Sequence, residues 1–308
     1  MKRIFFILML GAQFAAAQQK EVAITIDDIP NVMLIQKYDF SSLLLKRIDS
    51  LSLPVTAFIN ENNIQKSPFI KENQEVLGAW LKNRHVAAGN HSFSHLNYAD
   101  TSLEVFEEEV VKGEILTRKI LAPLGKNLVY FRFPFNSLGG DEKSHRQIEQ
   151  FLSQRGYTIA PFTIESEDWM YNALYGEALK NNDLEQARNI GQEYVAFTLK
   201  LFDYFEQLCL QRFGRSIRQI YLCHDNAINT DYLPLLVEQL IKKQYTFISL
   251  QEALRDKIYQ TPDVYFGRAG FSWIYRWEPD GAKRKALMQA EPGNLRLYNE
   301  YNKLTSGK

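Results

Sequence analysis

The stretch Val22-Ala23-Ile24-Thr25-Ile26-Asp27-Asp28-Ile29-Pro30 decides the predicted fold, because an apolar, β-rich run ends there in two acids and a proline. A run of this kind is typical of a buried parallel strand that delivers its last side chains into a loop. Similar strand-like runs follow at residues 55–59, 86–89, 129–134, 158–163, 219–223 and 245–248. Helical patterns separate them, at residues 43–51, 71–83, 103–121, 143–155, 184–213 and 232–243.

Strands that alternate with helices in this rhythm predict an α/β fold with a parallel sheet. The 308 residues suit either one large (β/α) barrel with a modest appendage or two small domains. We favour the barrel, since barrels of about 250 residues regularly form a single domain. Most of the reactive residues lie where a predicted strand gives way to a loop, which is where parallel barrels place their active sites.

The composition bears on the class of partner. The chain is 45% hydrophobic and 23% charged, which is an ordinary globular mixture. Lys and Arg together number 36, and so do Asp and Glu, so the formal net charge is zero. Because nucleic-acid binding depends on a basic surface, no nucleic-acid partner is expected.

The first residues have the order of a secretory signal peptide. Lys2-Arg3 precedes the apolar run Ile4–Leu10, and Ala15-Ala16-Ala17 then supplies small residues. We expect residues 1–17 to be a signal peptide and the protein to be exported, to a periplasm or to the cell exterior. A membrane anchor is the alternative, but this apolar run is too short to span a bilayer comfortably. After cleavage no stable membrane anchor is expected.

The two cysteines leave two interpretations open. Cys209 falls in a predicted helix and Cys223 in a predicted strand. They could pair in an oxidising compartment, or they could remain two buried thiols.

Two histidines and two acids have the character of metal ligands. In His91-Ser92-Phe93-Ser94-His95 the histidines are four residues apart, so a helical or tightly turned backbone can aim both imidazoles at one point. The adjacent carboxylates of Asp27 and Asp28 repel each other unless a cation is near. Asp28, His91 and His95 together provide three protein ligands and leave positions open for water and substrate, as a catalytic metal site requires. The plain alternatives are a polar loop or core histidine, and a turn or helix cap for the acids.

Five short motifs, in order over residues 22–255, resemble those of the polysaccharide deacetylases, the NodB-homology fold of carbohydrate esterase family 4. They are Thr25-Ile26-Asp27-Asp28, Gly89-Asn90-His91-Ser92-Phe93-Ser94-His95, Phe131-Arg132-Phe133-Pro134-Phe135, Glu165-Ser166-Glu167-Asp168-Trp169 and Ile220-Tyr221-Leu222-Cys223-His224. Each motif is weak by itself, but the ordered set is specific. The resemblance implies a distorted (β/α) barrel of the polysaccharide deacetylase type and metal-dependent hydrolysis of an acetyl group.

The resemblance also implies which residues bind the metal ion and move protons. The metal ligands would be Asp28, His91 and His95, with zinc the expected divalent ion for two imidazoles and one carboxylate. Asp27 would act as the general base and Arg132 would pair with it. His224 would donate a proton to the leaving group, and Asp168 would raise the pKa of His224 for that purpose.

Three further residues would contact the substrate if the resemblance holds. The backbone N–H of Phe135 would meet the oxyanion, and Trp169 and Leu222 would form an apolar wall around the acetyl methyl group. Plain alternatives remain for several motif residues: Arg132 as a surface arginine, Asp168 as a helix cap, Trp169 as core, and His224 as a structural partner of Asp225.

The chain departs from the family pattern in a few places. Ile29 stands where the family has a glycine, Asn136 where glycine is frequent, and Glu165 where aspartate is commoner. Residues 170–218 form a longer and more helical segment than the family suggests. None of these departures touches a proposed ligand or proton-transfer residue, so they bear on the choice of substrate more than on the chemistry.

Beyond residue 257 the alternation of strands and helices stops, and the chain becomes rich in Gly, Pro, Tyr and Trp. We therefore expect a deacetylase-like barrel domain over residues 18–257 and a C-terminal extension, residues 258–308, packed on the barrel. Aromatic side chains of the extension could stack on sugar rings, but core packing is the favoured use.

The favoured function is N-deacetylation of an amino-sugar glycan, chitin-like or peptidoglycan, so the expected partner is an acetylated carbohydrate. O-deacetylation of xylan and hydrolysis of a small non-sugar amide would use the same machinery and remain open. A non-catalytic glycan-binding module is the alternative of another class. The complete set of motif residues disfavours it, because a binding module has no need of a general base beside a metal.

Overall fold

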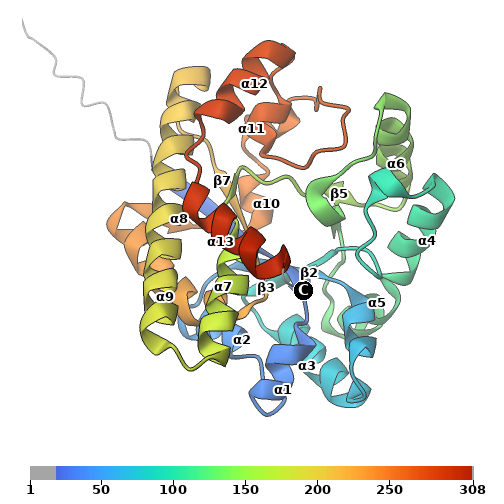
Figure 1. The fold of residues 1–308 in the computed structure, drawn as a ribbon. Coiled ribbons are helices and arrows are strands. Elements are labelled where there is room, and N and C mark those ends of the chain that lie inside the picture. The colour runs from blue at the N-terminus through green and yellow to red at the C-terminus, as the bar shows by residue number, and fades with distance from the viewer. Residues whose placement is uncertain (1–18, 307–308) are drawn as a thin grey trace, which may run out of the picture.

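Eight strands form one curved sheet in the computed structural model, which describes residues 19–306 (Figure 1). The strands are β1 (Lys20–Ile29), β2 (Val55–Ile59), β3 (Val86–Asn90), β4 (Tyr130–Phe131), β5 (Thr158–Ile159), β6 (Ile164–Glu165), β7 (Gln219–His224) and β8 (Tyr245–Phe247). Their order is β5-β4-β3-β2-β1-β7-β6, and β8 pairs with the first residues of β1. Every strand pair among the described residues is parallel. The predicted distorted (β/α) barrel is confirmed.

β1 lies at the centre of this sheet, which explains its uninterrupted apolar sequence. Residues 22–26 are all buried, because helices cover the outer face of the sheet and the inner face packs inside the barrel. Thr25 is the polar member of the run, and its hydroxyl donates to the carbonyl of Tyr221 at 2.9 Å. In register, Asp27 lies opposite His224 of β7, so two motif residues meet at the same strand ends.

The sheet does not close on itself. β5 and β6 are its two ends, and residues 160–163 connect them without pairing them to each other; we call these residues the seam. Arg132 fills part of this opening from inside the barrel. Its Nε donates to the carbonyl of Ala160 at 2.9 Å, and its Nη2 donates to the carbonyl of Pro161 at 3.2 Å. The arginine therefore replaces hydrogen bonds that a closed barrel would make between strands.

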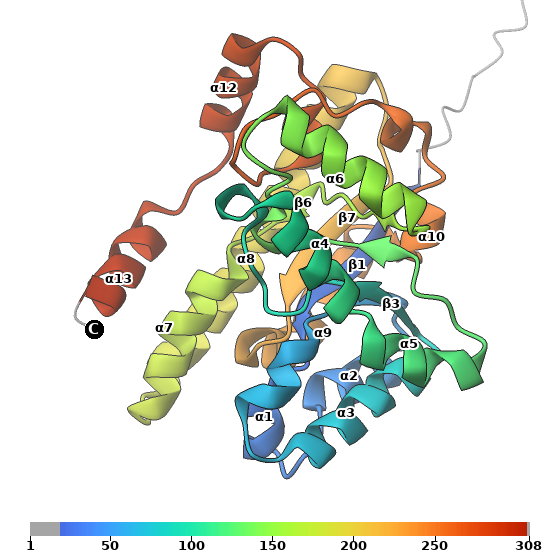
Figure 2. The ribbon, with the colours of Figure 1, turned by 90° about the vertical axis from the view of Figure 1, so that its right-hand side faces the viewer.

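Helices surround the sheet on its outer side (Figures 1 and 2). They are α1 (Val32–Lys37), α2 (Leu43–Ser50), α3 (Ile70–Lys82), α4 (Leu103–Lys112), α5 (Ile115–Leu121), α6 (Glu142–Gln154), α7 (Asp168–Lys180), α8 (Leu184–Phe213), α9 (Ala227–Lys242), α10 (Leu250–Ala253), α11 (Trp273–Arg276), α12 (Gly281–Ala290) and α13 (Leu295–Ser306). Short 3₁₀ turns occupy Glu61–Lys66, Tyr98–Asp100, Ala122–Leu124, Pro134–Asn136 and Lys257–Gln260. The long helical segment after the fourth motif consists mainly of α7 and α8, which pack side by side.

Local sequence signals fix many helix ends. The side chains of Ser42, Ser102, Asp141 and Asn226 each accept a backbone N–H in the first turn of the helix that follows. α6 ends just before Gly156, whose φ of +76° is the left-handed conformation predicted for this cap.

Several predicted elements differ in extent from those observed. The helix predicted over residues 232–243 begins earlier, as α9 (Ala227–Lys242). The strand predicted over residues 129–134 is only Tyr130–Phe131, because Pro134 opens a 3₁₀ turn. The strand predicted over residues 158–163 is β5 followed by the seam. The helix predicted over residues 103–121 is broken at Gly113 into α4 and α5. A Cβ atom on Gly113 would lie 2.6 Å from the carbonyl carbon of Ser92, so the break coincides with close packing on the histidine loop.

The C-terminal extension packs on the barrel through a buried aromatic group. Ile274, Tyr275, Arg276 and Trp277 are all buried, which agrees with core packing rather than a sugar-binding face for this part of the extension. α13 lies against α7.

Cys209 and Cys223 are both buried and form no disulfide, so the interpretation as two buried thiols is confirmed. Among residues 19–306, no helix is both long and apolar enough to cross a membrane. The predicted signal peptide, residues 1–17, lies outside the described residues.

Candidate active site

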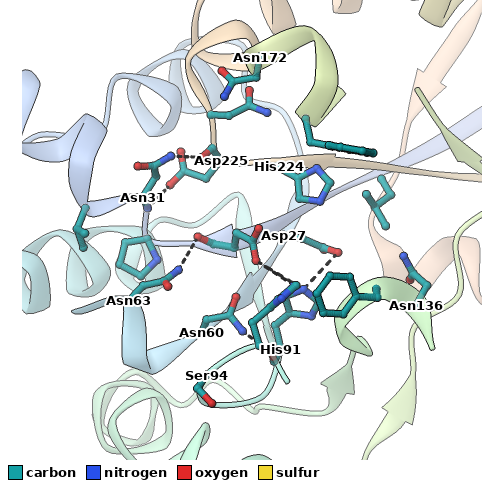
Figure 3. A pocket seen from close by; sticks show the side chains of 18 of the residues that line it. Asp27, Asn31, Asn60, Asn63, His91, Ser94, Asn136, Asn172, His224 and Asp225 are labelled. Atoms are coloured by element: carbon teal, nitrogen blue, oxygen red, sulfur yellow. Dashed lines mark hydrogen bonds and ion pairs between the residues drawn. The ribbon is translucent and has the colours of Figure 1, made fainter. Parts of the chain in front are cut away.

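The predicted site residues come together at the carboxyl ends of the strands, around a cavity of about 860 Å³ (Figure 3). Those that line the cavity are Asp27, Asp28, His91, His95, Phe135, Trp169, Leu222 and His224. The other two, Arg132 and Asp168, are fully buried behind this lining and contact Asp27 and His224 respectively. In Figure 3, Asp27 lies between His91 and His224.

Asp28, His91 and His95 converge as a three-ligand group. Oδ1 of Asp28 lies 3.8 Å from Nε2 of His91 and 3.5 Å from Nε2 of His95, and the three ligand atoms all lie within 4.8 Å of one another. Two ligand atoms at tetrahedral positions on a zinc ion lie about 3.4 Å apart, given zinc–ligand distances of about 2.1 Å. Two imidazoles and one carboxylate also form a donor set that zinc prefers. The residues therefore fit a divalent cation of this kind.

The protonation of these ligands suits a cation. Nδ1 of His91 lies 2.8 Å from the carbonyl oxygen of Arg132, which can only accept, so Nδ1 is the donor in this contact and Nε2 is the nitrogen that faces the site. Burial and the neighbouring His91 lower the pKa of His95 to about 4, so this ring is neutral near pH 7. Burial alone would raise the pKa of Asp28, but His224, His91 and His95 hold it below its usual value.

The histidine loop is fixed by polar groups that the sequence did not reveal. The buried side chain of Asn90 accepts the N–H of Ser92 at 2.8 Å through Oδ1, and its amide donates to the carbonyl of Val110 at 2.9 Å. The amide of Asn60 donates to the carbonyl of His91. Glu109 accepts both the N–H and the hydroxyl of Ser94, at 2.6 and 2.7 Å. These hydrogen bonds tie the histidine loop to the neighbouring protein groups.

Left-handed backbone conformations gather around the cavity. Asp28, Ser92, His95 and Phe135 have φ between +56° and +66°. Non-glycine residues rarely adopt this conformation, and they do so mainly where the surrounding structure enforces it, as at functional sites.

Asp27 is held beside the three-ligand group by charge. Its Oδ2 lies 3.7 Å from Nε2 of His91 and 3.6 Å from Nη1 of Arg132, while its side chain is almost fully buried. The predicted pairing of Arg132 with Asp27 is thus an ion pair at a distance longer than a direct hydrogen bond. Most hydrogen bonds of Arg132 go elsewhere: Nε and Nη2 donate to the seam, and Nη2 also donates to the hydroxyl of Thr25 at 3.1 Å.

His224 and Asp168 form a hydrogen-bonded pair across the cavity from the histidine loop. Nδ1 of His224 lies 2.7 Å from Oδ1 of Asp168. Burial lowers the pKa of His224, but the charge and hydrogen bond of Asp168 outweigh it and raise the pKa to about 10. His224 is therefore protonated near pH 7, as the sequence argument requires of a proton donor.

Asp168 begins α7 and is itself anchored by two asparagines that sequence reasoning missed. Its Oδ2 accepts the amide of Asn226 at 2.9 Å and also the amide of Asn229. Asn229 in turn accepts the hydroxyl of Tyr194, from the long helix α8, at 2.5 Å. The signal in the sequence is the spacing of these asparagines, three residues apart directly after the fifth motif, which places both at the start of α9.

Two further acids in the cavity have displaced pKa values. Burial, together with the charge of Asp168, raises the pKa of Glu165 to about 8. Burial raises the pKa of Asp225 to about 7, and Asp225 accepts the backbone N–H of Asn31 at 2.9 Å. Several groups that line this cavity thus have displaced pKa values, as is common at functional sites.

The three predicted substrate residues form the rest of the lining. Phe135 and Trp169 are half exposed, and Leu222 is buried at the base. The ring of Phe135 packs edge-on against His95, with ring centres 4.7 Å apart, while Trp169 packs edge-on against Tyr301 of the extension at 5.1 Å. The cavity therefore has two accessible aromatic side chains beside its polar centre.

The fold and this site define a (β/α)-barrel protein with a candidate centre for a divalent cation at the carboxyl ends of its strands. Residues 15–160, just under half of the chain, match the sequence model of the polysaccharide deacetylase family.

Known relatives are distant. A peptidoglycan-N-acetylglucosamine deacetylase of Bacillus cereus is 21% identical over 164 residues, which are 53% of this chain and 51% of that protein. The chain thus spans about half the length of the curated relative it matches. The crystal structure of a carbohydrate esterase family 4 pseudoenzyme from Bacillus anthracis aligns with a TM-score of 0.50 and 15% identity, over 77% of this chain and 66% of that one. A family 4 carbohydrate esterase from Streptomyces lividans aligns with a TM-score of 0.47 and 19% identity, over 77% and 97%.

Proposed function

We propose that the protein is a metal-dependent hydrolase that removes the acetyl group from an N-acetylated amino-sugar glycan. One observation carries this proposal: the three-ligand group of Asp28, His91 and His95 shares a single cavity with an acid, Asp27, and a protonated histidine, His224. A cation site needs neither of these two flanking groups for binding alone. Together they are the base and the acid that amide hydrolysis requires.

Zinc is the proposed ion, held by Asp28, His91 and His95. When bound, a divalent ion of this kind polarises a carbonyl group and lowers the pKa of water to about 7. The other steps belong to the side chains of the chain.

Asp27 is proposed to take a proton from the water whose oxygen attacks the acetyl carbonyl carbon. Its Oδ2 lies 3.7 Å from Nε2 of His91, and is therefore adjacent to the space in which the acetyl group would sit. The guanidinium of Arg132 lies on the other side of Asp27 and keeps the carboxylate directed at the cavity. Removing this base should leave substrate binding largely intact and stop the chemical step.

His224 is proposed to donate its proton to the sugar nitrogen as the C–N bond breaks, so that acetate and a free amine leave. Its pKa of about 10 keeps the proton in place near neutral pH, and Asp168 stabilises the charged ring. The backbone N–H of Phe135 is proposed to donate to the oxyanion, and Leu222 and Trp169 to contact the acetyl methyl group. His224, Phe135, Leu222 and Trp169 all line the cavity, so each of these roles fits the place that the residue occupies.

The proposed substrate class is an acetylated carbohydrate of the chitin or peptidoglycan type. The matching Bacillus cereus relative is a peptidoglycan-N-acetylglucosamine deacetylase, which supports an N-acetyl group as the target. Half-exposed aromatic side chains at the cavity also suit the apolar face of a sugar ring. We further propose that residues 1–17 direct export, so that the enzyme would meet its glycan outside the cytoplasm.

The experiment is an acetate-release assay with zinc-loaded protein on acetylated chitooligosaccharides, peptidoglycan, acetylxylan and a small acetylated amide. The proposal predicts release from one of the first two substrates and a loss of roughly 10²- to 10⁴-fold in kcat for Asp27→Asn, as expected for a general base. Asp203→Asn is the matched control, since Asp203 is an exposed partner of Lys243. Preference for acetylxylan or for the small amide would assign a different substrate class to the same site. Glycan and zinc binding without any release would identify a binding module and overturn the proposal.

A further inference from the structure

The C-terminal extension contributes a residue to the wall of the cavity. Gly270 lines it and lies directly on the backbone of the loop that carries Phe135. A Cβ atom built on Gly270 would lie 1.9 Å from the carbonyl oxygen of Phe135 and 2.8 Å from Cβ of Asn136. Both distances are far inside van der Waals contact, so only glycine fits here. The position of this glycine and the position of the Phe135 peptide are therefore linked.

The same segment is fastened to the seam of the barrel. The N–H of Trp273 donates to the carbonyl of Phe162 at 3.0 Å, and the hydroxyl of Ser272 donates to the carbonyl of Thr163 at 2.7 Å. Ser272 is itself buried. Arg132 satisfies the first two carbonyls of the seam from inside, and the extension satisfies the next two. The open side of the sheet is thus completed by residues from beyond the barrel.

A second anchor holds the segment on the other side of Gly270. Nη1 of Arg268 donates to the carbonyl of Ala99 at 2.9 Å, and Nη2 contacts the carboxylate of Asp100. In Figure 1 the loop that precedes α11 reaches toward β5. Because Gly270 is tied on both sides within two residues, it has little freedom to move away from Phe135.

We propose that the C-terminal extension is part of the active site, and that Gly270 is a positioning residue that sets the Phe135 peptide for oxyanion stabilisation. This inference rests on the proposed function, since it assigns a purpose to the contact in that reaction. Gly270 itself touches no reacting atom. It contacts the carbonyl of Phe135, which belongs to the peptide after the donor N–H, and so it acts through the left-handed backbone of Phe135 (φ 56°) that links the two peptides. An oxyanion donor must be placed to within a fraction of an ångström, so a small shift is costly.

The test is Gly270→Ala in the full chain, compared with Gly293→Ala. Gly293 lies in the same extension, and an added Cβ atom there would meet nothing within 4 Å. For Gly270→Ala we expect kcat for acetate release to fall about 10- to 100-fold while KM stays within about twofold, because the lost interaction forms only in the transition state. Zinc affinity should not change, since the ligands lie on other loops. Gly293→Ala should match the wild type throughout.

Ser272→Ala provides a second variant that adds no atom and so cannot clash. It removes the hydrogen bond from the Ser272 hydroxyl to the carbonyl of Thr163. We expect it to lower kcat as well, but by less than Gly270→Ala does. Hydrogen exchange of the peptide spanning residues 131–140 reports the contact independently of activity, and we expect faster exchange in Gly270→Ala alone of the two glycine variants.

Two results would overturn the inference: wild-type kcat and wild-type exchange in Gly270→Ala, or a fall in zinc affinity that parallels the fall in kcat. Absence of acetate release from the wild-type protein on every substrate would instead defeat the proposed function. Exchange would then still decide whether Gly270 holds the Phe135 loop.

Discussion

Asp168 binds His224 at two points: Oδ1 lies 2.7 Å from the ring Nδ1, and Oδ2 accepts the backbone N–H at 2.8 Å. The carboxylate therefore fixes both the charge and the place of the ring. Burial lowers the pKa of His224, and without Asp168 only the weaker effects of Asp28 and Asp27 would oppose it, so the pKa would fall well below its value of about 10.

Asp168→Asn should consequently change the pH dependence of activity. At pH 8 the wild-type ring is protonated and the variant ring is neutral, so we expect kcat to fall by roughly 10²- to 10⁴-fold. The deficit should shrink as the pH is lowered toward 5.5, where the variant ring regains its proton. Acetate release measured from pH 5.5 to 9.5 tests this, with Asp203→Asn as the control. Parallel profiles for the variant and the wild type would contradict it.

The pair of His224 and Asp168 should make the stability of the fold depend on pH in the alkaline range. The folded-state pKa of His224 is raised, so its stabilising effect is complete below about pH 6.5 and is lost as the pH rises through 10. Glu165 and Asp225 lose their own contributions at lower pH, by about pH 8 and 7. Between pH 8 and 10 we therefore expect Tm to decline in the wild type and to decline less in Asp168→Asn. Differential scanning calorimetry at fixed ionic strength checks this. Equal slopes of Tm against pH in the wild type and in Asp168→Asn would contradict the prediction.

Loss of one ligand should abolish the response to zinc. For His95→Ala and Asp28→Asn we expect zinc affinity to fall by at least about 100-fold, more than is typical for loss of a group that only supports a ligand. Zinc at 100 times its Kd should stabilise the wild-type fold by about 2.7 kcal/mol, and a chelator should reverse this. Thermal unfolding with and without zinc measures both effects. His85→Ala is the control, because His85 is a histidine outside the cavity that interacts with Arg84.

Gly113→Ala should disturb the metal site from a distance. The new Cβ atom would lie 2.6 Å from the carbonyl carbon of Ser92, and the histidine loop would have to move to accommodate it. We expect zinc affinity to fall about 10- to 100-fold, as for other changes in the support of a ligand. Gly78→Ala in α3 is the matched control, because nothing lies within 4 Å of the added atom, and stability should rise slightly there. Unchanged zinc binding in Gly113→Ala, measured by chelator competition, would refute the link.

Arg132→Lys should cost both stability and activity, because lysine cannot reach Ala160, Pro161 and Asp27 at the same time. We expect the free energy of unfolding to fall by about 2–4 kcal/mol, since buried carbonyls and a buried carboxylate lose their partner. Urea denaturation measures this effect. Arg146→Lys, which alters an exposed ion pair with Glu142, should change stability by less than about 0.5 kcal/mol. A wild-type midpoint for Arg132→Lys would show that the seam does not depend on the guanidinium.

The sequence predicted which strands carry the reactive residues better than it predicted where each helix and strand begins and ends. Apolar runs such as residues 22–26 and 219–223 are buried on both faces, so their composition reveals them as strands. The 30-residue helix α8 was predicted at its observed bounds, Leu184–Phe213, because an acid begins it and Gly214 follows it. The break at Gly113 and the short strands beside the seam could not be predicted, because contacts from distant segments set them.

The site divides in the same way. Asp27, Asp28, His91, His95 and His224 are visible in the sequence, since ionisable residues at strand ends stand out from an apolar background. The groups that hold them, such as Asn90, Asn229 and Gly270, are ordinary residue types whose function appears only when partners far along the chain come close.

The order of strands has a consequence for how the protein matures. Asp28 lies near the end of β1 and His91 directly follows β3, and these strands are not neighbours in the sheet, because β2 lies between them. The three ligands therefore meet only after two separate strand pairings have formed, and Asn90 at the end of β3 then holds the histidine loop. For the proposed metal enzyme, capture of the ion should thus be the closing event of assembly. If the chain is exported unfolded, it would travel without its ion and draw it from the surroundings of the cell.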